Sequence, residues 1–546
     1  MFPAVLRRPW VADAMVVAAL AVAGARMLAG VAGPPADELP WWANGSDAYV
    51  WGPDAGAWAL NALAFASGRW EDLDPHRMPT WSLFTATAMH LLGLDVAFAG
   101  HFVNKLFHVL LGPVIYLLGR ATGMRAGAVA AGVLASAQPV LLASAGRYGV
   151  DPTVSLMVPL TLLGGWAAGR WWPLAPIAGV IAGRTTVSHL TALGFALPGL
   201  LICLLAGRGW WRLLGAALYL AAAAATVYGI YSVFPTIPRD FVAGVFAEGI
   251  APAAGTSVAE QAHQKDAALA TLQANAPAAL ENVVSNVVEA FRVRGLPWGL
   301  ILALPWLGVL GPPAVEGTVQ GEGRLPWRVL RAVGAGLAGG LPLLAALLPL
   351  VALAAAGAPS RYSDNLLPVA GLLVLRGLST VAAPLSVLLG RYVAPAAAYV
   401  VEVGAFAWVT WAAWPHVENP ASVGMGVPPE EARAMPVGKA LAAHFESGVG
   451  GAVPLREALP YAGMVYCPNT VCPFSDDESG YRQCIDIIRQ ECRGDGPIPY
   501  VVTPGLTPEQ QTEPRKHMDA WIAGKLEPVA TVGSSRVYAL PREGDL

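Results

Sequence analysis

Acidic residues in the first long polar segment of this sequence are the first candidates for chemistry. Asp54 directly precedes an apolar, helix-compatible stretch, residues 55–67, that ends at Gly68. A carboxylate at the start of a helix can accept a proton from a nucleophile or bind a metal ion. The alternative interpretation is a helix N-cap, a position that aspartate favours.

Two short motifs combine arginine, tyrosine and aspartate. GRYGVDP contains Arg147 and Asp151, and RYSDNLLP contains Arg361 and Tyr362. A guanidinium binds phosphate through paired hydrogen bonds, and a nearby carboxylate can orient it. A structural turn with a local ion pair, or an arginine that extends from an apolar segment towards water, explains the same patterns.

A further polar group lies inside an apolar run. Its members are spaced by three and four residues, which places them close to one helical face: His101, Asn104, Lys105 and His108. A lysine within a membrane helix should face a cavity or a partner, where it can neutralise a phosphate. The alternative is that Lys105 extends to the membrane surface. Arg184 and His189 flank another expected hairpin and can join the same cavity, whereas Arg376 lies within a span and receives no role.

The elements that must position these side chains are helices that cross a bilayer. Of 546 residues, 55% are hydrophobic and only 13% are charged, whereas soluble domains carry about 25% charged residues. A spanning helix needs about 20 mostly apolar residues. Eleven such segments are expected, near residues 12–32, 97–118, 126–145, 152–169, 171–183, 188–206, 213–233, 297–314, 332–356, 365–388 and 392–414. The net charge of −3, without a basic block, argues against nucleic-acid binding.

Arginines predict the orientation of these spans. If the N-terminus is cytoplasmic, nearly every short inner connection is basic, as the positive-inside rule requires. These arginines are Arg7, Arg8, Arg120, Arg125, Arg170, Arg208, Arg212, Arg324, Arg328, Arg331 and Arg391. An odd number of spans then places the C-terminus outside. We expect a multi-pass protein, and a bacterial inner membrane as its location.

The sequence predicts two domains. Residues 1–414 form an all-α membrane domain with outer loops at 33–80 and 234–295, and residues 415–546 form a small extracytoplasmic α/β or α+β domain. Within the second domain, residues 464–466, 500–503 and 535–540 are typical of strands.

Cysteine placement supports an outer location for the second domain. Four of the five cysteines cluster there: Cys467, Cys472, Cys484 and Cys492. An even, clustered set predicts two disulfides in an oxidising compartment, whereas the spacings do not match the paired CxxC of a zinc site. Cys203 lies in an apolar run and is expected to be an inert buried thiol.

The order of these motifs resembles the membrane glycosyltransferases of the GT-C fold, in particular family 39 with its protein O-mannosyltransferase and aminoarabinose-transferase branch. An acid in the first outer loop, Asp54, precedes an interfacial helix and the segment MPTWSLFTATAMHLLG. The next span carries Lys105, the following hairpin ends at Asp151, and a late RY…LLP begins at Arg361. The resemblance covers most of residues 13–415. It departs from the family where Ala55, rather than a second acid, follows Asp54.

The resemblance implies transfer of a sugar from a polyprenyl-phosphate donor to a protein, lipid or glycan acceptor on the outer face. Asp54 would be the general base on the acceptor, and attack opposite the phosphate would invert the anomeric centre. Asp151 would orient Arg147 or bind acceptor or metal. The implied donor-binding residues are Lys105, Arg147, Arg361, Tyr362 and His189.

Two other functional classes remain open from the sequence. A multi-span transporter also needs buried ionisable groups, although such proteins often show internal repeats, and none is evident here. A metal-dependent oligosaccharyltransferase or polymer-ligase relative would use Asp54 and Asp151 to hold a divalent ion such as Mg or Mn.

Overall fold

The computed structural model describes seventeen parts of the chain. They are residues 9–31, 55–70, 73, 77–124, 126–188, 196–207, 209–233, 307–309, 336–347, 365–392, 434–446, 450–451, 458–462, 464–466, 477–492, 496–502 and 513–542. The chain folds into two compact units. The helical unit comprises Met1–Ala32, Asn104–Gly146 and Val150–Met425, and the mixed unit comprises Gly33–Val103, Arg147–Gly149 and Gly426–Leu546.

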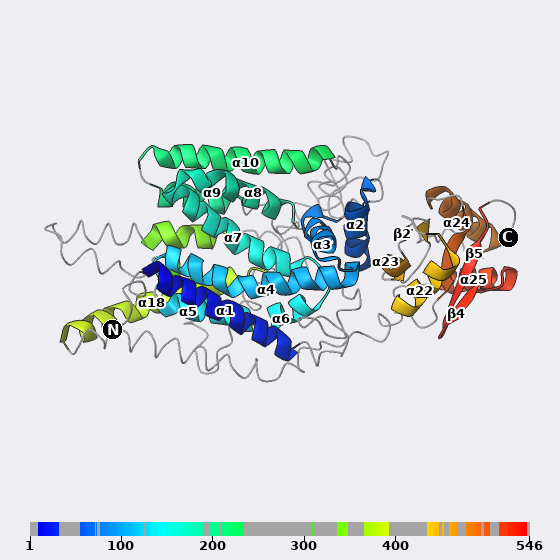
Figure 1. Ribbon diagram of the computed structural model, residues 1–546, viewed down its shortest axis with the longest axis horizontal. Helices are drawn as coiled ribbons and strands as arrows, with labels where there is room; N and C mark the ends of the chain where they lie inside the picture. The colour runs from blue at the N-terminus through cyan, green and yellow to red at the C-terminus, as the bar shows by residue number, and fades with distance from the viewer. Residues whose placement is uncertain are drawn as a thin grey trace. The chain divides into compact units, whose positions relative to one another are not determined.

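Apolar helices of very different lengths build the helical unit (Figure 1). They are α1 (Pro9–Val31), α5 (Ala126–Ala137), α6 (Pro139–Gly146), α7 (Asp151–Arg170), α8 (Ala175–Thr186), α9 (Ala196–Ala206), α10 (Trp211–Val233), α18 (Leu367–Tyr392) and the later part of α4 (Val96–Ala121). Among the described residues, four helices are long and apolar enough to cross a membrane: α1, α4, α7 and α10. A fifth span results if α5 and α6, which meet at a bend of 49°, cross together.

Five expected spans coincide with described helices of spanning length, whereas α8 and α9, at the spans expected near 171–183 and 188–206, are described over only 12 and 11 residues. α1, α4, α5 with α6, α7 and α10 match the segments near 12–32, 97–118, 126–145, 152–169 and 213–233. The expected spans near 297–314, 332–356 and 392–414 lie wholly or mostly outside the described residues. The protein is therefore an integral membrane protein, and the number of eleven spans stays a prediction.

Glycines let these helices approach closely. Two pairs spaced by four residues lie at helix contacts: Gly165 and Gly169 on α7, and Gly179 and Gly183 on α8. A Cβ at Gly165 would overlap the carbonyl oxygen of Gly199 on α9, and one at Gly179 would overlap that of Tyr219 on α10. Small residues at this spacing are how membrane helices pack, because no hydrophobic effect drives them together in lipid. Cys203 on α9 is a buried free thiol, as expected.

A buried arginine caps the end of α4. The helix ends in a turn at Gly123, whose φ of 94° suits glycine. Arg376 on α18 is only 1% exposed. Its guanidinium donates to the carbonyl oxygens of Thr122, at 2.5 Å, and Gly336, at 2.8 Å. The carbonyl end of a helix carries partial negative charge, which suits a cation. Arg376 therefore has a structural role that its sequence position did not reveal.

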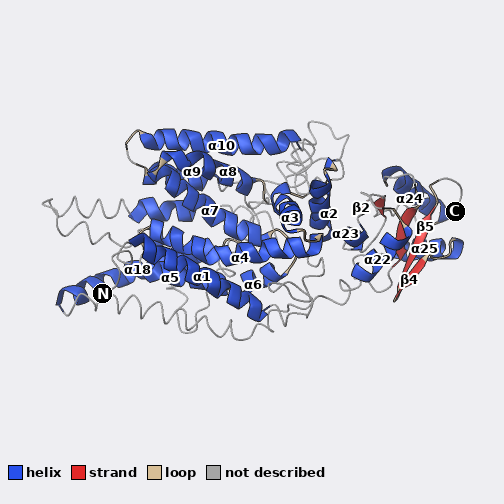
Figure 2. Cartoon of the chain, in the orientation of Figure 1, coloured by secondary structure: helices blue, strands red, loops and turns tan. Residues whose placement is uncertain are grey.

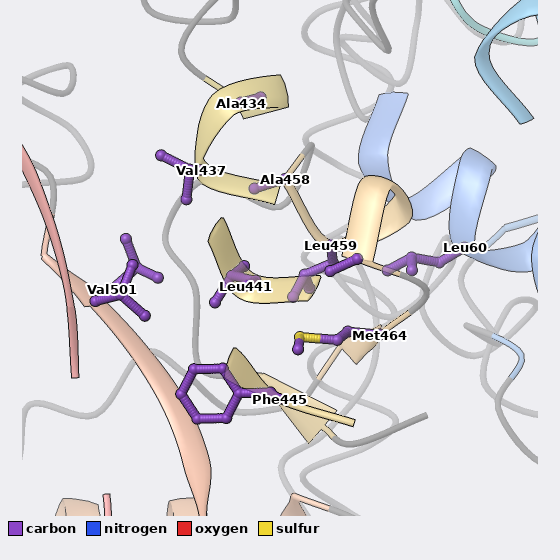
Figure 3. Close-up of a cluster of buried hydrophobic side chains, with 11 residues drawn as sticks. Leu60, Ala434, Val437, Leu441, Phe445, Ala458, Leu459, Met464 and Val501 are labelled. Atoms are coloured by element: carbon purple, nitrogen blue, oxygen red, sulfur yellow. The ribbon is translucent and has the colours of Figure 1, made fainter. Parts of the chain in front are cut away.

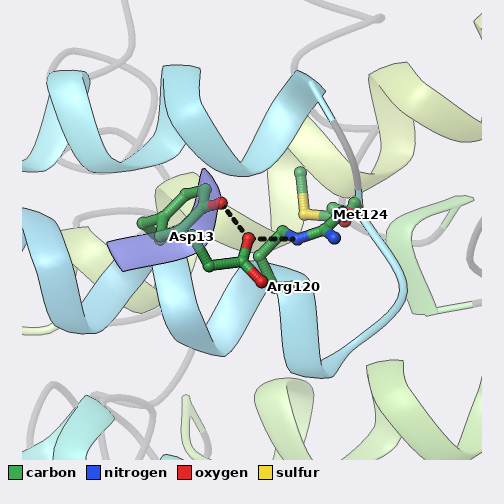
Figure 4. Close-up of polar contacts among 4 residues, drawn as sticks. Asp13, Arg120 and Met124 are labelled. Atoms are coloured by element: carbon green, nitrogen blue, oxygen red, sulfur yellow. Dashed lines mark hydrogen bonds and ion pairs between the residues drawn. The ribbon is translucent and has the colours of Figure 1, made fainter. Parts of the chain in front are cut away.

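A polar contact joins the beginning of α1 to the end of α4 (Figure 4). The hydroxyl of Tyr116 donates to Asp13 Oδ1 at 2.5 Å, and Nε of Arg120 lies 3.3 Å from the same oxygen. The start of one span and the end of the other are thus on the same side. That is the arrangement expected of two antiparallel spans whose connecting loop lies on the opposite side.

The mixed unit contains shorter helices and every strand of the described chain (Figure 2). Its helices are α2 (Ala55–Ser67), α3 (Pro79–Leu92), the first residues of α4, α22 (Ala434–His444), α23 (Leu459–Ala462), α24 (Glu478–Glu491) and α25 (Glu513–Lys525). β3 (Ile498–Val502), β5 (Ser535–Leu540) and β4 (Ala530–Val532) form an antiparallel sheet in that order, and β1 (Gly450–Gly451) pairs in parallel with β2 (Val465–Tyr466). The three segments expected to be strands coincide with β2, β3 and β5.

Two hydrophobic cores stabilise the mixed unit. The sheet core comprises Cys484, Ile485, Ile488, Cys492, Ile498, Tyr500, Met518, Ile522, Tyr538 and Leu540. The α2 core comprises Leu60, Ala434, Val437, Leu441, Phe445, Ala458, Leu459, Ala462, Met464, Val501 and Val537 (Figure 3). Cys484 and Cys492 are disulfide-bonded. Cys467 and Cys472 lie outside the described residues, so the pairing stays a prediction.

Candidate functional site

An aromatic cluster in the mixed unit holds the GRYG connector between α6 and α7. Its four members are Trp58 on α2, Trp81 on α3, His101 on α4 and Tyr148 in the connector. Edge-to-face contacts link them, with ring centroids 6.0 Å apart for Trp58 and Trp81, 4.8 Å for Trp81 and Tyr148, and 5.5 Å for His101 and Tyr148. This geometry is favourable because the positive ring edge meets the negative ring face.

Tyr148 is the anchor of this connector. It is 1% exposed, and its hydroxyl donates to the carbonyl oxygen of Val96 at 2.9 Å. Its ring lies so close to Gly100 that any Cβ there would overlap it. Burial raises the pKa of Tyr148 well above its usual value, so the hydroxyl stays protonated and remains a donor. Arg147, the residue before this anchor, is exposed.

The helix that follows Asp54 in the sequence is held in place by burial and by a hydrogen bond from α3. Residues 55–67 form α2 as expected, and Gly68 follows it with a φ of 70°. Ala55 is fully buried, and the hydroxyl of Ser82 on α3 donates to the carbonyl oxygen of Trp58 at 3.1 Å. Asp54 itself lies outside the described residues, so its role as a base stays a prediction.

A polar cluster in the helical unit surrounds Asp151 at the start of α7. Asn365 donates from Nδ2 to Asp151 Oδ1 at 3.1 Å, and the hydroxyl of Ser155 donates to Asn365 Oδ1 at 3.1 Å. The Ser155 hydroxyl also lies 3.0 Å from the carbonyl oxygen of Asp151. Asn365 and Ser155 are 1% and 2% exposed. Because buried polar groups need such partners, the cluster fixes the orientation of the Asp151 carboxylate.

An apolar pocket lies beside this cluster in the same unit. It is formed by the broken helix α5–α6 and by the first turns of α18, which begin two residues after Asn365. Its lining is Ala131, Leu134, Ala135, Gln138, Leu141, Leu367, Pro368, Gly371 and Leu375. Gln138, at the break between the two helices, is the one polar residue of this lining.

Solved structures with a similar fold match nearly the whole chain. The crystal structure of ArnT from Cupriavidus metallidurans bound to undecaprenyl phosphate matches with a TM-score of 0.51 and 16% identity, over 97% of this chain and 98% of that chain. The oligosaccharyltransferase AglB from Archaeoglobus fulgidus, in complex with an inhibitory peptide and a dolichol-phosphate, matches with a TM-score of 0.50 and 14% identity, over 98% of this chain and 75% of that chain. This chain has the GT-C fold. No family model and no curated protein matches its sequence.

The GT-C fold confirms the resemblance that the order of motifs predicted. Of the predicted site residues, the structure describes Lys105, Arg147 and Asp151. Lys105 is 7% exposed, so its side chain faces protein rather than lipid. The others, Asp54, His189, Arg361 and Tyr362, lie outside the described residues, and the roles assigned to all seven stay predictions.

Two histidines of the polar face of α4 make structural contacts: His101 with the ring of Tyr148, and His108 with α5. His108 is buried, and its Nε2 lies 2.9 Å from the carbonyl oxygen of Ser136 on α5. His108 therefore joins two helices of the GT-C bundle. Asn365 was missed by sequence reasoning, although it directly follows the RYSD motif, because an asparagine before an apolar span gives no sign of its partner.

The described residues do not by themselves form a site for a divalent ion. One AglB structure from Archaeoglobus fulgidus is a complex with Zn and sulfate. In the described part of this chain, no three histidine, cysteine or acidic side chains come together. The oxygen of Asp151 that the structure places in the cluster accepts an amide N–H, whereas Mg²⁺ takes about six oxygen ligands.

Proposed function

We propose that this protein is a glycosyltransferase that moves a sugar from a polyprenyl-phosphate donor to an acceptor on the outer side of the membrane. The observation that carries the proposal is the hydrogen bond between Asn365 and Asp151. It joins the GRYGVDP and RYSDN motifs, which the GT-C resemblance assigns to donor binding. Structures of ArnT and AglB with this fold were solved with undecaprenyl phosphate and with dolichol-phosphate.

The proposed reaction is a single inverting displacement. Asp54 removes the proton from the acceptor nucleophile, which attacks the anomeric carbon from the face opposite the phosphate. The bond between that carbon and the phosphate oxygen breaks, and both of its electrons leave with the polyprenyl phosphate. Lys105, Arg147 and Arg361 stabilise the negative charge of the leaving group. Tyr362 and His189 complete the donor site in this proposal.

Burial and shape around the described residues support this use. Burial of the Lys105 ammonium group within an apolar helix costs free energy unless a negatively charged group binds it. The apolar pocket between α5–α6 and α18 includes Leu367, two residues after Asn365. It therefore provides an apolar surface next to the polar cluster. A lipid whose head is a phosphate and whose tail is a prenyl chain requires that combination. A transporter would need neither the acid before α2 nor a carboxylate fixed at the start of α7.

The outer location is also a proposal. The arginines of the short connections place the N-terminus in the cytoplasm, and α2 belongs to the first external loop. Because α2 shares a hydrophobic core with residues 434–464, no bilayer can separate them. The C-terminal part of the mixed unit is then periplasmic in a bacterial inner membrane, which suits its clustered cysteines.

Turnover of a radiolabelled polyprenyl-phosphate sugar by the purified full chain tests the proposal. Asp54→Asn should lower turnover by about 100-fold or more, the usual contribution of a general base. Asp95→Asn is the matched control, because Asp95 is exposed and caps the Phe98 amide at 2.9 Å, a bond that asparagine can also accept. A folded wild type that releases no sugar would reject the function. Unchanged turnover by Asp54→Asn would reject the base.

A further inference from the structure

Helix α2 is buried around its circumference. Nine of its thirteen residues are buried, whereas a helix lying on a membrane surface keeps one polar face exposed. One neighbour is α3, through the contact of Trp58 with Trp81 and the hydrogen bond from Ser82. The helix expected at the membrane interface is therefore enclosed by protein within the mixed unit.

Its second neighbour is the C-terminal part of the chain. Leu60 is 7% exposed and belongs to the α2 core, where Leu441 and Leu459 are fully buried. Figure 3 shows the side chain of Leu60 directed towards Leu459 of α23. The other buried residues of this core come from the segment after residue 433, so Leu60 is the one buried residue that the described part of the first loop contributes, and the partly buried Leu63 packs against the same core.

We propose that the C-terminal part of the mixed unit, residues 434–540, is a positioning element for catalysis that acts through Leu60. The inference rests on the proposed function, in which Asp54 is the base. Asp54 immediately precedes α2 in the sequence, and Leu60 is the sixth residue of that helix, about 8 Å along its axis from Ala55. A rigid helix transmits a displacement over that distance. Leu60 is a positioning residue, because it acts on the reaction through Asp54.

The geometry of the two contacts explains why the C-terminal part is needed. Trp58 fixes α2 on the side of α3, and Leu60, with the partly buried Leu63 beside it, fixes it on the side of α23. If the second contact is lost, the helix can shift or rotate about the first. A displacement of about 1 Å at a catalytic group can lower a rate by about 100-fold, so a modest shift of α2 is enough to impair the base.

Kinetics of Leu60→Ala in the full chain test the catalytic part of this inference. We expect kcat to fall by about tenfold or more with the donor KM unchanged, and the pH profile of kcat to shift because the surroundings of the base change. Phe65→Ala is the matched control: Phe65 is on the same helix but packs against Trp70, at 6.1 Å between centroids. A kcat and pH profile of Leu60→Ala equal to those of Phe65→Ala would overturn the proposal.

Hydrogen exchange provides a readout that needs no turnover. Leu441→Ala, in the α2 core, should accelerate exchange of the amides of residues 55–67 by about tenfold or more. Ile522→Ala, in the sheet core of the same unit, should accelerate exchange in α25 and leave α2 as in the wild type. Unchanged exchange of α2 in Leu441→Ala would overturn the inference. If Leu441→Ala accelerates exchange in α2 but the wild type transfers no sugar, the contact between the two parts stands and the proposed function is rejected.

Discussion

Asn365 donates its side-chain amide to the carboxylate of Asp151 across 214 residues of sequence, at 3.1 Å. This bond places the starts of α7 and α18 on the same side of the bundle. If α7, α8, α9 and α10 each cross once, an even number of crossings must separate residues 233 and 365. The two spans expected near 297–314 and 332–356 supply that number. A single hydrogen bond thus supports the topology that the arginines predict.

Removal of the Asn365 amide should therefore damage both stability and transfer. In Asn365→Ala, Asp151 loses a donor and the Ser155 hydroxyl keeps only the Asp151 carbonyl oxygen as acceptor, and the two lost hydrogen bonds cost about 1–3 kcal/mol together. We expect a lower Tm in detergent and a turnover lower by about tenfold, since the carboxylate is no longer oriented. Ser155→Ala is the graded comparison, because it leaves the bond between Asn365 and Asp151 intact. A Ser155→Ala variant more impaired than Asn365→Ala would contradict this assignment.

The anchor at Tyr148 predicts a specific pH dependence. Burial raises the pKa of Tyr148 well above its usual value. For a group whose pKa is raised on folding, the associated stability is complete below the unfolded pKa of about 10 and is lost as pH rises through the folded pKa. The free energy of unfolding of the wild type should therefore exceed that of Tyr148→Phe by ~1 kcal/mol, the contribution of one hydrogen bond. This difference should be constant from about pH 6 to about pH 9.

Thermal unfolding of the two proteins across this pH range checks the expectation. The advantage of the wild type should decline only at alkaline pH above about 10, where the phenol of the unfolded chain ionises. If the stability difference between the two proteins already disappears near neutral pH, the Tyr148 hydroxyl does not remain a protonated donor to Val96 as expected.

The parts of this fold that follow from local pattern could be predicted. Apolar runs of spanning length and the order of Asp54, Lys105 and Asp151 gave the GT-C fold, and alternating residues gave β3 and β5. Asn365 and Leu60 could not be found this way, because their functions depend on partners far away in sequence. An apolar α2 gives the same pattern whether Leu60 faces lipid or a second domain. A buried asparagine becomes recognisable only once its acceptor is placed beside it.

Arg376 illustrates the same limit and gives a stability prediction. Its guanidinium reaches two carbonyl oxygens at once, that of Thr122 after the end of α4 and that of Gly336, which one ammonium group does less well. Each lost hydrogen bond to a charged donor costs about 1.5–3 kcal/mol. We expect the Tm to decrease in the order wild type, Arg376→Lys, Arg376→Met.

The donor KM serves as the internal control for these variants. Leu375, the residue before Arg376, lines the pocket, but the Arg376 guanidinium is bound to the carbonyl oxygens of Thr122 and Gly336. The folded fraction of Arg376→Lys should therefore bind donor as the wild type does. A raised KM without a lower Tm would assign Arg376 to the donor site instead of the end of α4.

The disulfides of the mixed unit can be assigned by exclusion. Cys484 and Cys492 are disulfide-bonded and buried in the sheet core. They are eight residues apart along α24, about 12 Å by helical rise, whereas bonded cysteines have Cα atoms within about 7 Å. They cannot pair with each other, and Cys203 is a free thiol. We therefore expect each to pair with one of Cys467 and Cys472.

Peptide mapping by mass spectrometry without reduction tests this pairing. Peptides containing Cys484 and Cys492 should each be linked to one containing Cys467 or Cys472, and reduction should lower the Tm of the mixed unit. Each such bond is worth about 2–4 kcal/mol through restriction of the unfolded chain. Cys203→Ala should leave both links unchanged, because its thiol lies in the helical unit. A direct link between Cys484 and Cys492, or two free thiols among these four cysteines in the native protein, would refute the assignment.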